Sequence, residues 1–144
     1  MSRPIQTWRD LEALVKAFEA ADIPREAWTH REHLALTAWY VLQNPLNATD
    51  RMRRGIQRLN AANGIETTLT GGYHETLTVS WVRLIRHHIS ELDGLPPIDR
   101  VNAVLEAFAD KTQMLRYYSR ELILAPKARF GWVEPDLQPL PELN

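Results

Sequence analysis

Two histidines three positions apart suggest metal chemistry in this chain. His30 and His33 stand in the stretch 26–40, where the residue pattern predicts a helix that carries both imidazoles on one face. His74 stands at the polar start of a later predicted helix. Three imidazoles can bind one divalent cation and leave a coordination position open for water or substrate. We therefore expect His30, His33 and His74 to bind a divalent metal, with zinc as the first choice and nickel, iron or manganese as alternatives.

Carboxylates and hydroxyls accompany these histidines. Glu26 shares the predicted face of the histidine pair, and Glu75 directly follows the third histidine. Either glutamate could ligate the metal or orient a ligating imidazole, and in an enzyme it could act as general base toward metal-bound water. Tyr40 and Thr78 continue the two faces, so we expect them to contact a substrate. The chain has no cysteine, which excludes thiolate ligands and disulfides.

The same histidines admit two other interpretations. In a metal-free protein they would hydrogen-bond to a small anion, and Arg54, Arg58 or Arg129 would supply the counter-charge, since guanidinium suits carboxylate and phosphate. In a structural or interaction module the three histidines would be well separated and solvated. Their distances distinguish these cases, because metal-binding nitrogens must converge to about 2.0–2.2 Å from one point.

Composition sets limits on the partners. The 144 residues include 17 basic and 18 acidic side chains, so the net charge of −1 provides no general attraction to nucleic acid or to anionic membranes. The apolar fraction of 44% is enough for one domain with a core. No apolar run approaches the ~20 residues of a membrane span, and the N-terminus does not resemble a signal peptide. We expect a cytoplasmic protein with a small-molecule ligand and leave its oligomeric state open.

Helical periodicity dominates the chain up to about residue 119. We expect an all-α, single-domain bundle of five to six helices spanning residues 1–144. The expected helices cover about 7–21, 24–43, 47–62, 73–90 and one or two segments within 97–119. Pro24 fits the first turn of the second helix, and Asp22 is its candidate cap. Gly55 would permit close helix packing.

The segment from about 120 to 144 is rich in proline and predicts no regular helix in its last part. We expect this segment to be irregular and to pack over the bundle, with one possible turn near residues 127–132. Its anchors would be Trp132, Leu137 and Leu140.

Several spaced motifs resemble a family of small, uncharacterised helical bacterial proteins. The motifs are Trp28-Thr29-His30-x-x-His33-Leu34, an arginine and isoleucine followed by Asn60 and Gly64, Gly72-Tyr73-His74-Glu75-Thr76-x-Thr78, Tyr117-Tyr118-Ser119, and Ala128-Arg129 with Trp132, Pro135 and Asp136. The resemblance implies a shared helical fold and no particular reaction. It also draws attention to Arg129 and Asp136, which we expect to form an internal salt bridge that holds the tail.

Overall fold

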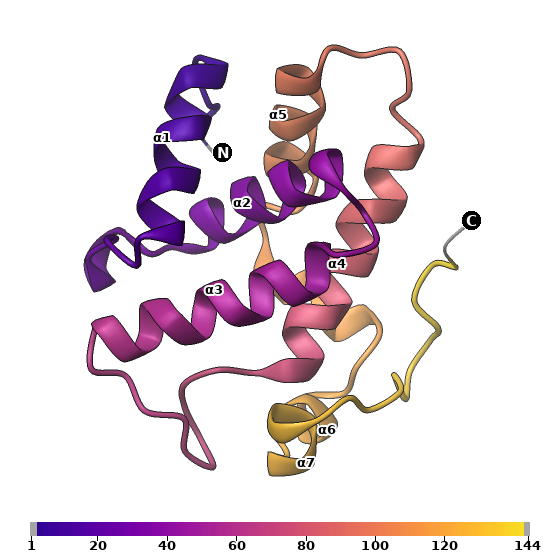
Figure 1. The fold of residues 1–144 in the computed structure, drawn as a ribbon. Helices are drawn as coiled ribbons and strands as arrows, with labels where there is room; N and C mark the ends of the chain where they lie inside the picture. The colour runs from indigo at the N-terminus through magenta and orange to yellow at the C-terminus, as the bar shows by residue number, and fades with distance from the viewer. Residues whose placement is uncertain (1–2, 143–144) are drawn as a thin grey trace.

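The computed structural model describes residues 3–142, and all regular secondary structure in this range is helical (Figure 1). The longer helices are α1 (Trp8–Glu19), α2 (His30–Gln43), α3 (Ala48–Ala62), α4 (Glu75–Ser90) and α5 (Pro97–Ala107). The shorter elements are the 3₁₀ segments η1 (Arg25–Ala27) and η2 (Lys111–Arg116) and the helices α6 (Arg120–Ile123) and α7 (Pro126–Phe130). The predicted all-α fold class is therefore confirmed. No helix of the described range is long and apolar enough to cross a membrane.

Helix α2 lies at the centre of the bundle. It contacts α1, α3, α4 and α5, and Figure 1 shows it crossing the middle of the molecule. Every residue from Leu34 to Ala38 is buried, so the helix has no solvated face over this stretch. A helix that is buried all round must be surrounded by other elements, and here four helices surround it.

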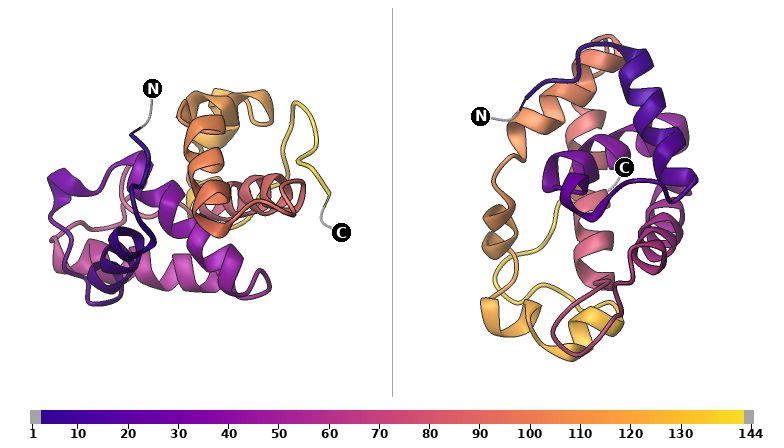
Figure 2. Two further views of the ribbon diagram at one scale, coloured as in Figure 1. Left: turned by 90° about the horizontal axis from the view of Figure 1, so that it is seen from above. Right: turned by 90° about the vertical axis from the view of Figure 1, so that its left-hand side faces the viewer.

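The two ends of the molecule are built from different elements. Figure 2 shows α6 and α7 at the end of the molecule opposite to α1 and the start of α5. The loop between α3 and α4 reaches the same end as α6 and α7, where the guanidinium of Arg129 donates to the carbonyl of Gly72 at 2.9 Å. A surface built from η2, α6, α7 and this loop therefore lies beside the first turn of α4.

Two helix termini follow their sequence signals. The hydroxyl of Thr7 accepts a hydrogen bond from the amide of Asp10 at 3.1 Å and caps α1. Helix α3 ends at Ala62 with Asn63 as its C-cap, and Gly64 follows with a φ of +69°, a left-handed conformation that glycine adopts without strain. The amide of Ile65 then donates to the carbonyl of Asn60 at 2.8 Å, which completes a Schellman motif.

The predicted start of the second helix at Pro24 is wrong. Pro24 precedes the short η1 segment, which has no side-chain cap, and α2 begins only at His30. The hydroxyl of Thr29 hydrogen-bonds to the carboxylate of Glu32, one helical turn into α2. Glu26 therefore lies on η1, exposed to solvent, and not on the face of α2 that carries the histidines.

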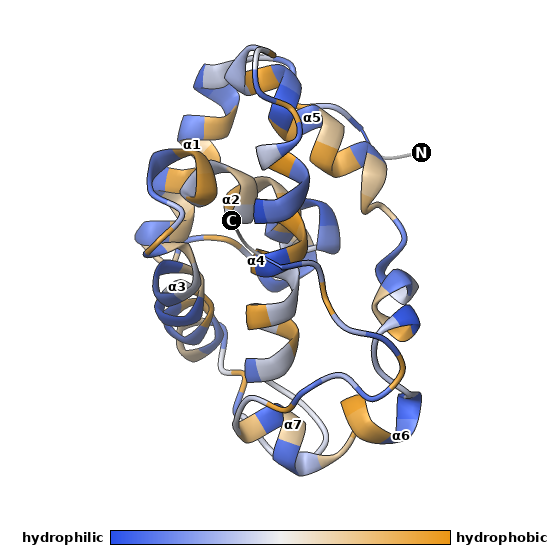
Figure 3. Ribbon diagram, turned by 90° about the vertical axis from the view of Figure 1, so that its right-hand side faces the viewer, coloured by the Kyte–Doolittle hydropathy of each residue, from blue (hydrophilic) through white to orange (hydrophobic). Residues whose placement is uncertain are grey.

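The expectation of an irregular segment from residue 120 onward holds only for its last part. Ser119 caps α6 by accepting from the amide of Leu122 at 3.1 Å, and α7 follows directly. From Gly131 the chain is irregular and passes over one side of α4 (Figure 3), where Arg83 lies 5.9 Å from the ring of Trp132. Leu140 is buried, but Leu137 is 56% exposed, so its predicted role as an anchor is wrong.

Gly55 of α3 packs directly against the side chain of Phe18 of α1. A Cβ atom at this position would lie 2.1 Å from Cε2 and 2.2 Å from Cζ of Phe18. Phe18 is fully buried and stacks on Trp28 with a centroid distance of 5.5 Å. The phenyl ring therefore has little room to move away, and the predicted close packing at Gly55 is confirmed.

We expect Gly55→Ala to lower the free energy of unfolding by up to about 2 kcal/mol. Overpacking against Phe18 costs roughly 1–3 kcal/mol, and the ~1 kcal/mol gain in helix propensity offsets only part of this cost. Urea denaturation measures the effect. Gly131→Ala is the matched control, because the nearest atom to its Cβ would be 3.8 Å away and the change should be close to neutral. Equal stability of the two variants would contradict the packing argument.

Candidate functional site

A cavity of about 420 Å³ lies where α2, α3 and α4 meet. His30, His33, His74 and Thr78 all line it, so the structure brings the three predicted histidines to one site. The remaining lining residues are Trp28, Ile56, Asn60, Ile65, Gly72, Tyr73, Leu77, Trp81 and Lys111. We call this space the histidine cavity. It combines aromatic and aliphatic walls with a few polar groups, as ligand sites do.

His74 uses both ring nitrogens to hold the backbone. Its Nδ1 accepts a hydrogen bond from the amide of Leu77 at 3.1 Å and so caps α4. Its Nε2 donates to the carbonyl of Ile123 at 2.7 Å, which connects α4 to α6. The ring is buried, and burial lowers the pKa of His74. His74 is therefore neutral and protonated on Nε2, with no lone pair left for a metal.

His30 has one nitrogen in use. Its Nε2 lies 2.9 Å from the carbonyl of Phe108 and donates to it, so Nδ1 carries the lone pair. The ring also meets the edge of Trp81 at a centroid distance of 5.1 Å. Burial lowers the pKa of His30 in spite of the bond to the carbonyl. The imidazole is a neutral acceptor near one wall of the histidine cavity.

His33 is the least satisfied of the three imidazoles. Neither of its nitrogens has a hydrogen-bond partner among residues 3–142, and its ring meets the edge of Trp28 at 5.9 Å. Part of the ring faces the cavity, and protein surrounds the rest. This burial, with a smaller effect of His30, lowers the pKa of His33 to about 4. His33 is therefore a neutral imidazole whose hydrogen bonds are left for a ligand or for water.

The residues present do not fit a three-histidine metal centre. Within the described range, no group of three or more His, Asp or Glu side chains is placed to hold a metal ion. The reason is His74, whose only lone pair accepts the hydrogen bond that caps α4. Binding a metal through His74 would break this cap, which is worth about 1 kcal/mol.

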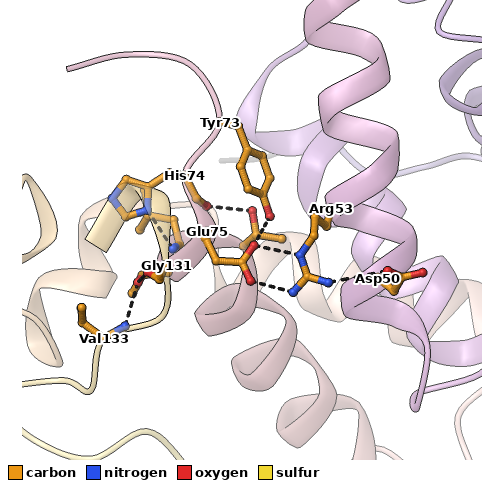
Figure 4. Close-up of polar contacts among 10 residues, drawn as sticks. Asp50, Arg53, Tyr73, His74, Glu75, Gly131 and Val133 are labelled. Carbon is orange, nitrogen blue, oxygen red and sulfur yellow. Dashed lines mark hydrogen bonds and ion pairs between the residues drawn. The ribbon is translucent and has the colours of Figure 1, made fainter. Parts of the chain in front are cut away.

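Glu75 belongs to a different network, which Figure 4 shows. Arg53 donates to its two oxygens at 2.9 and 2.6 Å, and the hydroxyl of Tyr73 donates to one of them at 2.6 Å. These hydrogen bonds, above all those from Arg53, lower the pKa of Glu75. The carboxylate is thus ionised and engaged by donors, which makes it a poor general base in this arrangement.

Four other predicted site residues do not line the histidine cavity. Tyr40 donates to Glu19 at 2.8 Å between α2 and α1, which is a packing role. Arg54 is exposed on α3 and pairs with Asp50 at 3.2 Å. Glu26 lies on η1, and Arg129 borders two neighbouring cavities.

The predicted salt bridge between Arg129 and Asp136 is wrong. Arg129 donates to the carbonyls of Gly72 and Tyr73 at 2.9 and 3.3 Å. Asp136 accepts from the amide and the hydroxyl of Ser119 at 2.8 and 2.6 Å. Each side chain therefore holds a different part of the C-terminal segment.

Lys111, Asn60, Trp28 and Trp81 are cavity residues that the site prediction omitted. Trp28 and Asn60 do occur in the motifs that carry the family resemblance, which was a usable signal. No sequence signal pointed to Lys111. It follows Asp110, the capping residue of η2, and only the tertiary structure brings it to the cavity. Lys111, and not the predicted Arg54, Arg58 or Arg129, is the cationic residue that lines this cavity.

Comparisons with protein-family models, with curated proteins and with solved structures found no match for this chain. The family resemblance of the motifs therefore stays a prediction.

The lowered pKa of His33 predicts a loss of stability in mild acid. The unfolded chain takes up a proton at this imidazole below about pH 6.5, whereas the folded protein does so only near pH 4. Stability therefore falls as the pH drops through this window, by at most about 2 kcal/mol at pH 5.

We expect His33→Gln to reduce this pH dependence, measured as urea midpoints at pH 7 and pH 5. Part of the pH dependence of stability should remain in this variant, because the pKa values of His30 and His74 are also lowered. His87→Gln, which changes a histidine outside the cavity on α4, should keep the wild-type dependence. An unchanged dependence in His33→Gln would refute the assigned environment.

Proposed function

We propose that this chain binds a small organic molecule in the histidine cavity without a metal. The supporting observation is His33, a neutral imidazole that lines the cavity and has no partner among residues 3–142. His33 is half-buried, and its nitrogens are not among the buried polar atoms without a partner, so they are open to a ligand or to water in the cavity. The volume of about 420 Å³ falls within the ~300–1,000 Å³ of ligand pockets.

The walls indicate what kind of molecule fits. Trp28 and Trp81 provide aromatic surface, and Ile56, Ile65 and Leu77 provide aliphatic surface, so the body of the ligand is flat and largely apolar. The nitrogens of His33 and the amide of Asn60 supply hydrogen bonds. Asn60 lines the cavity and is half-buried.

The pKa values favour binding over acid–base catalysis. An imidazole with a pKa of about 4 stays neutral at pH 7 and is a weak base. His30 and His74 are neutral as well and donate to main-chain carbonyls. We therefore propose hydrogen bonding to the ligand as the role of His33, in place of the predicted metal ligation.

The test uses 2-naphthol, a flat molecule that is uncharged at pH 7, as a probe, with binding measured by quenching of tryptophan fluorescence and by calorimetry. We expect His33→Ala to weaken binding about five- to tenfold, which corresponds to the loss of one hydrogen bond. His87→Ala is the matched control and should bind like the wild type. Absence of 2-naphthol binding, or equal binding by both variants, would overturn the proposal.

A metal titration separates this proposal from the metal-binding alternative. We expect 100 µM Zn²⁺, Ni²⁺, Mn²⁺ or Fe²⁺ to leave the melting temperature of the untagged protein unchanged. A site with a Kd of ~1 µM would instead add about 2.7 kcal/mol of stability, which is several degrees for a chain of this size. A rise that disappears in His30→Ala and His33→Ala would establish metal binding and refute the metal-free site.

A further inference from the structure

A smaller cleft of about 200 Å³ adjoins the histidine cavity. The two spaces share His74, Leu77 and Lys111 among their lining residues. The smaller cleft is formed by η2, α6, α7 and the first turn of α4, at the end of the molecule that Figure 2 shows opposite to α1. We call it the cationic cleft, because of the side chains that line it.

Three cations and no carboxylate line this cleft. Lys111, Arg120 and Arg129 come from η2, α6 and α7, respectively. None of the three forms an ion pair with another residue of the described range, whereas Arg31, Arg53 and Arg54 pair with carboxylates elsewhere. Unpaired like charges around one small space repel one another, and a bound anion removes this repulsion.

Among the described residues, no carboxylate forms an ion pair with these three cations. The carboxylate of Asp110 accepts hydrogen bonds from the amide and the hydroxyl of Thr112, at 2.9 and 2.6 Å. Glu121 is exposed and is not among the lining residues. The positive charge of the cleft is therefore available to an incoming group.

Arg129 is held in a fixed position beside the cleft. One of its terminal nitrogens donates to the carbonyls of Gly72 and Tyr73, which fixes the guanidinium in place. Fixed guanidinium groups bind phosphate and carboxylate through paired, charge-assisted hydrogen bonds.

We infer that the cationic cleft binds the oxyanion of the same molecule whose apolar body occupies the histidine cavity, and that the ligand is an aromatic phosphate monoester or a similar dianion. The inference rests on the proposed function, since it assigns the second half of that ligand. A dianion suits three cations better than a single carboxylate does. Lys111 lines both spaces and stands where the two parts of the ligand would join.

The test compares phenyl phosphate with phenol, benzoate and inorganic phosphate, by calorimetry at pH 7.5 and two salt concentrations. We expect the wild type to bind phenyl phosphate at least tenfold more tightly than each of the other three, with an affinity that falls as salt rises. Arg120→Gln should weaken phenyl phosphate roughly tenfold and leave phenol unchanged. Arg116→Gln is the matched control, because Arg116 is exposed on η2 and lines neither space, and it should bind like the wild type.

Three other outcomes would contradict either the role of the cationic cleft, the joined ligand or both proposals. Phenol that binds as tightly as phenyl phosphate would overturn the role of the cationic cleft and leave the proposed function intact. Inorganic phosphate that binds as tightly as phenyl phosphate would show an anion site independent of the histidine cavity and refute the joined ligand. Absence of binding for both phenol and phenyl phosphate, together with absence of 2-naphthol binding, would overturn both proposals.

Discussion

The burial of α2 on all sides is the constraint on which the site depends. A helix without a solvated face must pair its polar side chains with protein groups or leave them unsatisfied. Thr37 donates to the carbonyl of His33 at 2.8 Å, Tyr40 donates to Glu19, and His30 donates to Phe108. His33 and Trp39, whose Nε1 is buried, have no partner among the described residues, and of the two it is His33 that lines the cavity. Its imidazole is therefore the group of α2 that is left for a ligand.

Local signals explain how much of the fold could be predicted. The cap at Thr7 and the stop at Gly64 depend on residues next to the helix end, so both could be predicted from the sequence. The start of α2 was not, because Pro24 fits the first turn of an α-helix and of a 3₁₀ segment equally well. The short helices α6 and α7 have too few residues to show a helical period. Their formation depends on the packing of α7 against α4 and of α6 against α7.

The three histidines and Thr78 of the site were predicted, but the roles of the histidines were not. Helical spacing placed His30 and His33 on one helix, and the polar start of α4 suggested His74. Their roles depend on the carbonyls of Phe108 and Ile123, which lie 78 and 49 residues away along the chain. Any residue can supply a carbonyl, so the sequence carries no mark of these partners. For the same reason Lys111 could not be assigned, although it lines both spaces.

His74 lies at the border between the histidine cavity and the cationic cleft. One imidazole starts α4, holds α6 through Ile123 and lines both the histidine cavity and the cationic cleft. Protonation would turn its Nδ1 from an acceptor into a second donor facing the amide of Leu77 and would weaken the cap of α4, whereas the Nε2–H would keep its hydrogen bond to the carbonyl of Ile123. A shift of this one imidazole would therefore alter a wall of both spaces.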